Sequence, residues 1–506
     1  MPPYNITVNV MAPAPEKQSN RYVNDLRRLT FVQGEVTQLR GKLLPFALAA
    51  IFLVIAGIYG NMSLQVAKQD VVMLVAAAVI GGYMALNIGA NDVANNMGPA
   101  VGSKVLSVLA AVFIAAVFES AGALLAGGDV VKTVSKGIIN PGQGVDIADF
   151  RNLMLSALLA AALWINLATF LNAPVSTTHS IVGGVMGGGI AAAGFGLVNW
   201  VTLSKIAASW VISPVFGGMV AASLLFLIEI KIMRTKERNI AARKWVPVLI
   251  GLMAGAFTAY MAMKGLKKIW KPEVPTIILL SIAALVASWA ASVPFVASRA
   301  AKIGNRKKEI YSLFNLPLIM GVALLCFAHG ANDVANAVGP LAAIVSTFSG
   351  DEIAAKVGIP FWVMLIGAGG LALGLLLFGP KLINTVGDKI TRLNAPRAYC
   401  VALASAVTVL IATTLGLPVS STHIAIGAIF GIGFLRESME NPNKTRLKPG
   451  HRINQTADDA FDNIQSRLKR KLVRRRFVLS IAAAWVITVP ASALLSASLF
   501  GVLHLL

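Results

Sequence analysis

The chain has 506 residues, of which 56% are hydrophobic and only 13% are charged, and its mean hydropathy is +0.73. Soluble domains carry about 25% charged residues, so this composition excludes a soluble protein and indicates an integral membrane protein. The formal net charge of +22 does not indicate a nucleic-acid partner, because the Lys and Arg residues gather in the loops between apolar segments.

Apolar runs of spanning length recur along almost the whole chain, and the alternation of polar and apolar residues that marks a membrane β-barrel is absent. We therefore predict an all-α integral membrane protein with about 10–12 membrane-spanning segments. The two cysteines, Cys326 and Cys400, fit no metal-binding spacing and predict no disulfide framework.

The first half of the chain begins with a polar segment, residues 1–42, which we predict to be a cytoplasmic tail. Its first apolar run comes too late for a signal peptide. Residues 43–69 hold one additional span. The next apolar segment starts near residue 71, and we expect it to break at the polar motif Gly-Ala-Asn-Asp-Val-Ala-Asn over 89–95. A helix then follows over 105–125.

Residues 127–149 are predicted to form a loop, and 153–171 form the next span. This span runs into a second motif, Pro-Val-Ser-Thr-Thr-His over 174–179. A glycine-rich apolar stretch and a long helix with Trp210 complete the half. Glycines of this kind allow helices to pack closely in lipid.

Residues 230–311 connect the two halves through two spans and two basic loops, at 231–244 and 299–308. Both motifs then return in the same order. The first recurs as Gly-Ala-Asn-Asp-Val-Ala-Asn over 330–336, and the second recurs as Pro-Val-Ser-Ser-Thr-His over 418–423.

The last helix carries Ala-Trp-Val-Ile-Thr around Trp485, which echoes Ser-Trp-Val-Ile-Ser around Trp210. Three markers in register are strong evidence of an internal duplication, which we place at 70–229 and 312–503. Both tryptophans are interpreted as packing residues or interfacial anchors.

The basic loops predict that the two repeats are inverted. Loop 231–244 follows the last helix of repeat one, whereas loop 436–476 follows the second motif of repeat two, one span earlier. Inverted repeats put both loops in the cytoplasm together with loop 299–308, and parallel repeats would not. Four lysines contradict this arrangement because it places them outside: Lys264, Lys267, Lys268 and Lys271.

The motif Pro-Val-Ser-[Ser/Thr]-Thr-His is typical of a helix start, since Pro fits the first turn and Ser or Thr caps free N–H groups. At membrane depth, such a helix N-terminus offers aligned N–H donors and hydroxyls to an oxyanion. A Ser/Thr-rich break that satisfies only its own backbone is the alternative. The predicted anion ligands are Ser176, Thr177, Thr178, Ser420, Ser421 and Thr422.

Asp92 and Asp333 are costly at membrane depth, which indicates a use for them. Next to an anion they would repel it, so we expect a cation or protons to neutralise them. A carboxylate can also accept a hydrogen bond from a protonated phosphate. The alternative for either residue is a helix cap or a structural pair.

Amide oxygens in the same motif suit a hard cation such as Na⁺. The predicted cation ligands besides the two aspartates are Asn91, Asn95, Asn332, Asn336 and Glu119. Glu119 has no partner in the second repeat, and a packed, protonated acid is its alternative role. Asn96 stands where the second copy has Ala337, so the two repeats need not contribute equally. His179 and His423 are predicted to support the site, as proton relays, oxyanion contacts or donors to the hairpin backbone.

These paired motifs resemble those of the inorganic phosphate transporter (PiT) family of sodium- or proton-coupled symporters, over about residues 70–503. The resemblance implies two inverted repeats with broken helices and re-entrant hairpins, and phosphate bound between them. The chemistry of the residues adds Asp92 and Asp333 to the predicted phosphate ligands. The family also includes sulfate carriers and both coupling ions, so neither the anion nor the coupling ion follows from it.

We therefore predict a multi-pass symporter of the plasma (inner) membrane that imports inorganic phosphate with Na⁺ or H⁺. A sulfate carrier or a passive anion channel is the alternative. The residues show no nucleophile–base constellation and no nucleotide-binding loop, so no enzyme is predicted. We expect no cofactor and no metal beyond a transported Na⁺. A homodimer is among the arrangements that the sequence leaves open.

Overall fold

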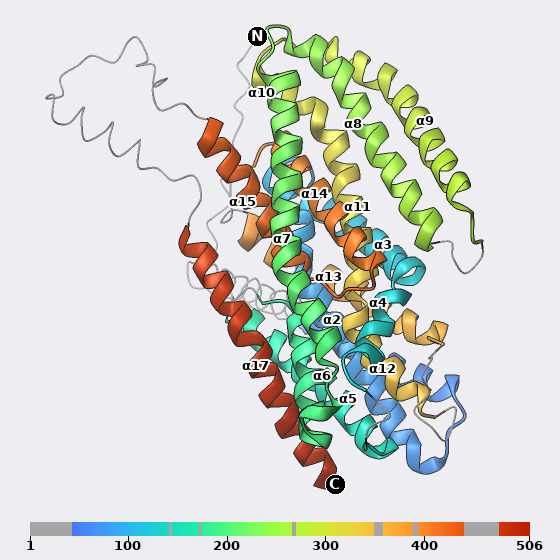
Figure 1. Ribbon diagram of the computed structural model, residues 1–506. Helices are drawn as coiled ribbons and strands as arrows, with labels where there is room; N and C mark the ends of the chain where they lie inside the picture. Colours follow the sequence, from blue (N-terminus) through green and yellow to red (C-terminus); the bar gives the residue numbers. More distant parts are fainter. Residues whose placement is uncertain are drawn as a thin grey trace, which may run out of the picture. The chain divides into compact units, whose positions relative to one another are not determined.

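Long apolar helices make up nearly all of the described chain (Figure 1). The computed structural model describes residues 43–140, 144–171, 175–265, 270–348, 358–387, 393–439 and 475–505. Within these ranges, 11 helices are long and apolar enough to cross a membrane, which confirms the all-α class and the predicted number of spans. They cover Leu43–Ser63, Lys68–Gly102, Val108–Ala126, Ile147–Phe170, Trp200–Met233, Arg238–Gly265, Val274–Ala300, Lys307–Ser346, Phe361–Ile383, Ala395–Thr414 and Val486–Leu505.

The chain divides into two units, Met1–Ile51 and Phe52–Leu506, and the second contains all the helices from α2 to α17. The predicted tail 1–42 and most of the basic loop 436–476 lie outside the described residues.

Two series of helices follow the same order along the second unit, with α8 (Arg238–Tyr260) and α9 (Val274–Ala300) between them. The first series is α2 (Val71–Gly102), α3 (Val108–Ala126), α5 (Ile147–Phe170), α6 (Thr177–Ala193) and α7 (Trp200–Ile228). The second is α11 (Asn315–Asp333) with α12 (Ala335–Ser346), then α13 (Phe361–Gly387), α14 (Ala395–Thr414), α15 (Ser421–Met439) and α17 (Arg475–Leu505).

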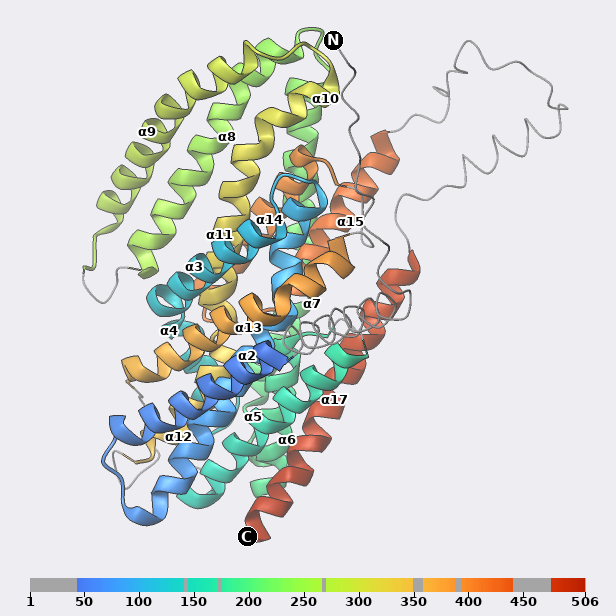
Figure 2. The same ribbon diagram turned by 180° about the vertical axis from the view of Figure 1, so that it is seen from behind.

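Each helix of one series packs on the other series in a reciprocal way. Helix α2 packs on α13 as α11 packs on α3, and α6 packs on α17 as α15 packs on α7. Figures 1 and 2 show α17 lying along α6. Such reciprocal packing is the pattern expected of two copies related by a two-fold axis. That the copies are inverted across the membrane stays a prediction.

The reciprocity extends to single residues. A Cβ atom on Gly89 would overlap the carbonyl oxygen of Leu371, and a Cβ on Gly330 would overlap that of Glu119. Glycine is therefore required at both positions because a backbone of the opposite series lies directly against it. The two contacts also identify Leu371 as the counterpart of Glu119.

The first polar motif does not break its helix, so that prediction was wrong: α2 continues through Asn91 and Asp92 to Gly102. The motif holds no proline before Pro99, and its Ala and Val residues are compatible with a helix, so nothing local forces a break. The second copy does interrupt its helix, at Val334 between α11 and α12.

Polar caps start the helices that lead into and out of the second motif. Asp146 caps α5 by accepting a hydrogen bond from the amide of Asp149, and Asn394 caps α14 through the amide of Arg397. Helix α6 begins at Thr177 and α15 begins at Ser421, where the motif predicts helix starts. Neither α6 nor α15 is among the 11 span candidates. Their re-entrant course stays a prediction.

The segment 127–149 is not a simple loop as predicted, because it contains α4 (Gly128–Lys132) and a turn of π-helix, Thr133–Gly137. Asp129 in this segment accounts for Lys264, one of the four lysines that the inverted arrangement places outside the cell. The ammonium of Lys264 lies 2.6 Å from the Asp129 carboxylate, so this lysine is largely neutralised in place. Lys264 lies in a turn of π-helix, Met261–Gly265, directly after α8. Helices α8 and α9 pack side by side at one edge (Figure 2).

Candidate functional site

Asp92 lies where the N-termini of both motif helices meet. The Thr177 hydroxyl donates to its Oδ2 atom over 3.0 Å, and the Thr422 hydroxyl donates to its Oδ1 atom over 3.3 Å. The residue is 1% exposed. One carboxylate from α2 thus joins hydroxyls from α6 and α15, which are 245 positions apart in the sequence, counting from 177 to 422.

Asp333 occupies the matching place on α11. The Ser421 hydroxyl donates to its Oδ2 atom over 3.3 Å, as Thr177 does to Asp92. Its Oδ1 atom is buried and has no hydrogen-bond partner within the described residues. A buried carboxylate oxygen without a donor is costly, so this atom is available to a cation or a proton.

The motif asparagines link the two series. Asn95 donates to the Thr422 hydroxyl oxygen over 2.8 Å, and Asn336 donates to the Thr178 hydroxyl oxygen over 3.2 Å. Each asparagine therefore contacts the helix N-terminus of the opposite series. The Oδ1 atom of Asn336 has no hydrogen-bond partner among the described residues, which leaves an amide oxygen free for a ligand.

Other predicted ligands are committed to the backbone. Ser176 accepts from the amide of His179 over 3.2 Å, and Ser420 accepts from the amide of His423 over 3.4 Å. These two hydroxyls are N-caps, so Thr177 and Ser421, one residue further on, face the carboxylates instead.

Asn332 braces the turn before α15. Its amide nitrogen donates to Thr413 and to the carbonyl of Leu417, and its oxygen accepts from the amide of Val419. These bonds use the groups that a cation would need, so its geometry fits a structural role better than a cation ligand. The amide nitrogen of Asn91, its counterpart, is buried without a partner within the described ranges.

The supporting histidines lie against each other. The rings of His179 and His423 are 4.6 Å apart between centroids, and the Trp210 ring is 3.8 Å from that of His179. The indole of Trp210 donates to the carbonyl of Pro418 over 3.1 Å. Trp210 therefore has the packing role that the sequence predicts, and the two histidines form one ring cluster with it beside the helix starts.

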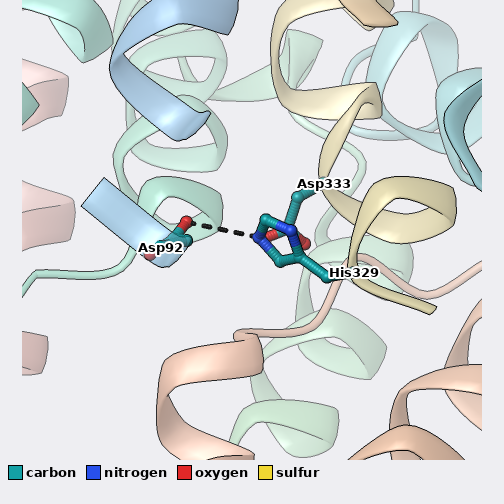
Figure 3. A group of neighbouring side chains, drawn as sticks. All are labelled: Asp92, His329 and Asp333. Carbon is teal, nitrogen blue, oxygen red and sulfur yellow. Dashed lines mark ion pairs between the residues drawn. The ribbon is translucent and has the colours of Figure 1, made fainter. Parts of the chain in front are cut away.

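His329 is the site residue that sequence reasoning missed. Figure 3 shows its ring between Asp92 and Asp333. Its Nε2 atom lies 3.0 Å from Asp333 and 3.6 Å from Asp92, and its Nδ1 atom lies 3.2 Å from Glu119. A signal was present: His329 precedes Asp333 by four residues, which places both on one face of a helix.

Glu119 lies at the rear of this cluster and is fully buried. Its Oε1 atom accepts a hydrogen bond from Asn96 over 2.8 Å and faces the His329 ring. Glu119 therefore reaches the two aspartates through His329.

The cluster combines groups that suit a cation with groups that suit an anion. Ligand atoms of Asp92, His329 and Asp333 lie within 4.8 Å of one another. Two carboxylates at that separation repel by roughly 3 kcal/mol at an effective dielectric constant of about 20, so a positive charge between or beside them is stabilised. The starts of α6 and α15 add hydroxyls and helix N-termini, which suit an oxyanion. The arrangement can therefore hold an anion and a cation together.

Known proteins are similar to this chain in sequence and in fold. A sequence profile of the phosphate transporter family matches residues 88–496. A Helicobacter pylori protein assigned as a phosphate permease is 42% identical over 94% of this chain and 98% of its own length. Inorganic phosphate transporter 2-1 of Arabidopsis thaliana is 34% identical over 83% of this chain and 70% of its own length.

A solved structure, that of a sodium-dependent phosphate transporter, superposes with a TM-score of 0.73 at 35% identity. The match covers 86% of this chain and all of the solved one. The profile match over most of the chain, the relatives and the shared fold agree with the paired motifs: the chain is a member of the phosphate transporter family, a family of transporters and not of enzymes.

Proposed function

We propose that the chain is a secondary active symporter that imports inorganic phosphate, driven by a gradient of Na⁺ or H⁺. The observation that carries the proposal is the pairing of two buried carboxylates, Asp92 and Asp333, with hydroxyls at two helix N-termini. The N-termini and hydroxyls attract a phosphate, and the carboxylates repel it until a cation binds. Binding of the anion is thereby coupled to binding of the cation.

Sodium is the coupling ion that the site favours. Carboxylate and amide oxygens are ligands for a hard cation, and Oδ1 of Asp333 and Oδ1 of Asn336 lack donors within the described residues. The solved relative is a sodium-dependent transporter, which supports the same ion here. A passive channel would need no such cation site at the anion.

The two aspartates favour phosphate over sulfate as the transported anion. Phosphate carries a proton at neutral pH and can donate it in a hydrogen bond to a carboxylate, whereas sulfate carries none. Uptake of radiolabelled phosphate by cells in Na⁺ and then choline medium, with arsenate and sulfate as competitors, tests this. Arsenate should compete well and sulfate poorly; the reverse order would identify a sulfate carrier.

The hydroxyl donors should tune phosphate affinity. In this structure the Thr177 and Ser421 hydroxyls donate to the two aspartates, and we propose that they turn to the phosphate once a cation neutralises those carboxylates. We then expect Thr177→Ala and Ser421→Ala to raise the phosphate KM roughly two- to tenfold, because each removes one hydrogen bond of about 0.5–1.5 kcal/mol. Initial uptake rates against phosphate concentration give the KM. Ser180→Ala is the matched control, since among the described residues the Ser180 hydroxyl donates to the carbonyl of Ser176, the N-cap of its own helix, and to no aspartate. An unchanged KM in both site variants would remove these hydroxyls from the anion site.

We also propose that the two helix series are inverted repeats in the plasma membrane, with the basic loops in the cytoplasm. Both native cysteines are buried, so single cysteines can be introduced directly. Lys302 and Lys271 are both exposed. Lys302→Cys should react with an impermeant maleimide only after permeabilisation, and Lys271→Cys should react in intact cells. Labelling of Lys302→Cys from outside would contradict the orientation.

A further inference from the structure

The two halves of the site differ in their ionisable residues. His329 directly precedes Gly330, and the residue that precedes Gly89 in the first motif is Ile88. Both side chains are fully buried. A histidine that contacts both aspartates therefore has an aliphatic counterpart in the other half.

Glu119 shows the same asymmetry. The glycine contacts make Leu371 its counterpart, because Gly330 lies on the Glu119 carbonyl and Gly89 lies on the Leu371 carbonyl. Asn96, which donates to Glu119, corresponds to Ala337 in the second motif.

These unmatched polar residues lie together. Asn96 donates to Glu119 over 2.8 Å, Glu119 lies 3.2 Å from Nδ1 of His329, and Nε2 of His329 lies between the two aspartates. Cys326, whose counterpart is Ala85, also lies beside Glu119. The mirror set, Ala337, Leu371 and Ile88, is entirely apolar. Within the described residues, Asn96, Glu119 and His329 thus form a row of polar contacts that reaches both aspartates, and the mirror positions hold no such row.

We propose that Asn96, Glu119 and His329 form a positioning unit in which the His329 ring contacts Oδ2 of Asp333 and faces Oδ2 of Asp92. The other two oxygens then form two unequal cation sites, because Oδ1 of Asp333 has no donor within the described residues and Oδ1 of Asp92 accepts from Thr422. His329 is within 3.6 Å of both Oδ2 atoms, the place where a single cation would bridge them. With Oδ2 of Asp333 engaged, its Oδ1 atom is the one left for a cation. This inference rests on the proposed cation-coupled function and adds a specificity determinant to it.

The residues at the mirror positions of the other half suggest the variant that tests this unit. Asn96→Ala, Glu119→Leu and His329→Ile together reproduce the apolar set that the other half already accommodates at matching positions. Removing all three leaves no unpaired partner of Glu119 or His329 behind. Asp92 and Asp333 lose the histidine but keep the hydroxyl hydrogen bonds of Thr177, Thr422 and Ser421. Glu119→Gln is a second variant that keeps the size of the side chain and removes its charge.

Sodium dependence is the readout that a merely structural role would not move. We expect the triple variant to raise the Na⁺ KM of phosphate uptake roughly fivefold or more, with the phosphate KM at saturating Na⁺ within about twofold. Glu119→Gln should give a smaller rise of the same sign. For purified protein, the NaCl concentration that half-maximally raises the thermal unfolding temperature, with choline chloride as reference, should rise in parallel.

The matched control is Ile88→Leu, which alters the mirror position of His329 and should leave the Na⁺ KM unchanged. A triple variant that inserts, transports and keeps the wild-type Na⁺ KM would overturn the positioning unit, as would an equal change in Ile88→Leu. Should the triple variant not fold, an unchanged Na⁺ KM in Glu119→Gln would overturn it equally. A wild-type protein without any cation dependence would instead refute the proposed symport, so the two failures are distinguishable.

Discussion

Concentrative phosphate uptake should be abolished by Asp92→Asn and equally by Asp333→Asn. Each change keeps the size of the side chain but removes its charge and replaces one acceptor oxygen with a donor. Asp92 accepts a hydrogen bond from a hydroxyl at the start of α6, and Asp333 accepts one from a hydroxyl at the start of α15. Both aspartates face His329. An amide there neither neutralises a cation nor offers it two oxygens, so coupling is lost.

The measurement is radiolabelled phosphate uptake normalised to protein in the membrane, because both variants are expected to insert. Asp149→Asn provides a matched control, since its carboxylate contacts His504, which is exposed, away from the cluster. We expect normal uptake in this control. Near-normal coupled uptake in both site variants would contradict the mechanism.

A second large effect should come from a single methyl group. Gly89→Ala places a Cβ atom against the backbone carbonyl of Leu371 on α13, and a backbone carbonyl cannot turn away as a side chain can. Overpacking of this kind costs about 1–3 kcal/mol and sometimes more. We expect a clear loss of folded protein in the membrane and a lower unfolding temperature for what remains.

Gly98→Ala is the control on the same helix, because nothing lies within 4 Å of a Cβ at that position. Alanine favours a helix over glycine by about 1 kcal/mol, whereas the ring of Pro99 disfavours a Cβ on the helical residue before it, so this variant should be close to neutral. Fluorescence-detected size exclusion and thermal unfolding in detergent separate the two. Equal stability of the two variants would show that α2 and α13 do not pack as closely as described.

The sequence was sufficient to predict the spans and several of the residues that the structure brings together. Buried charge is so costly in a membrane that a repeated Asn-Asp motif and a repeated hydroxyl motif indicate function wherever they occur. The structure brings Asp92, Asp333, Thr177, Ser421 and Thr422 together, as the paired motifs suggest. Local rules such as N-capping also predicted where α6 and α15 begin.

Tertiary contacts account for what the sequence did not reveal. Asn332 is as polar as Asn95 in the motif, and only the turn packed on it shows that its amide braces Leu417 and Val419. Helix α2 continues through Asp92, whose carboxylate has partners on α6 and α15 that the sequence alone does not identify. His329 was within reach, because the cost argument applied to Glu119 holds equally for a histidine inside a span.

Flux into proteoliposomes tests the central claim, coupling of phosphate to a cation at the paired aspartates, most directly. Purified protein is reconstituted, and labelled phosphate is followed with an inward Na⁺ gradient, with equal Na⁺ on both sides, and with a proton gradient alone. We predict accumulation above the external concentration under the Na⁺ gradient, and its loss when Na⁺ is equal on both sides. Entry that never exceeds the external concentration under either cation gradient, and that proceeds at the full rate without Na⁺ or a proton gradient, as through a channel, would contradict it.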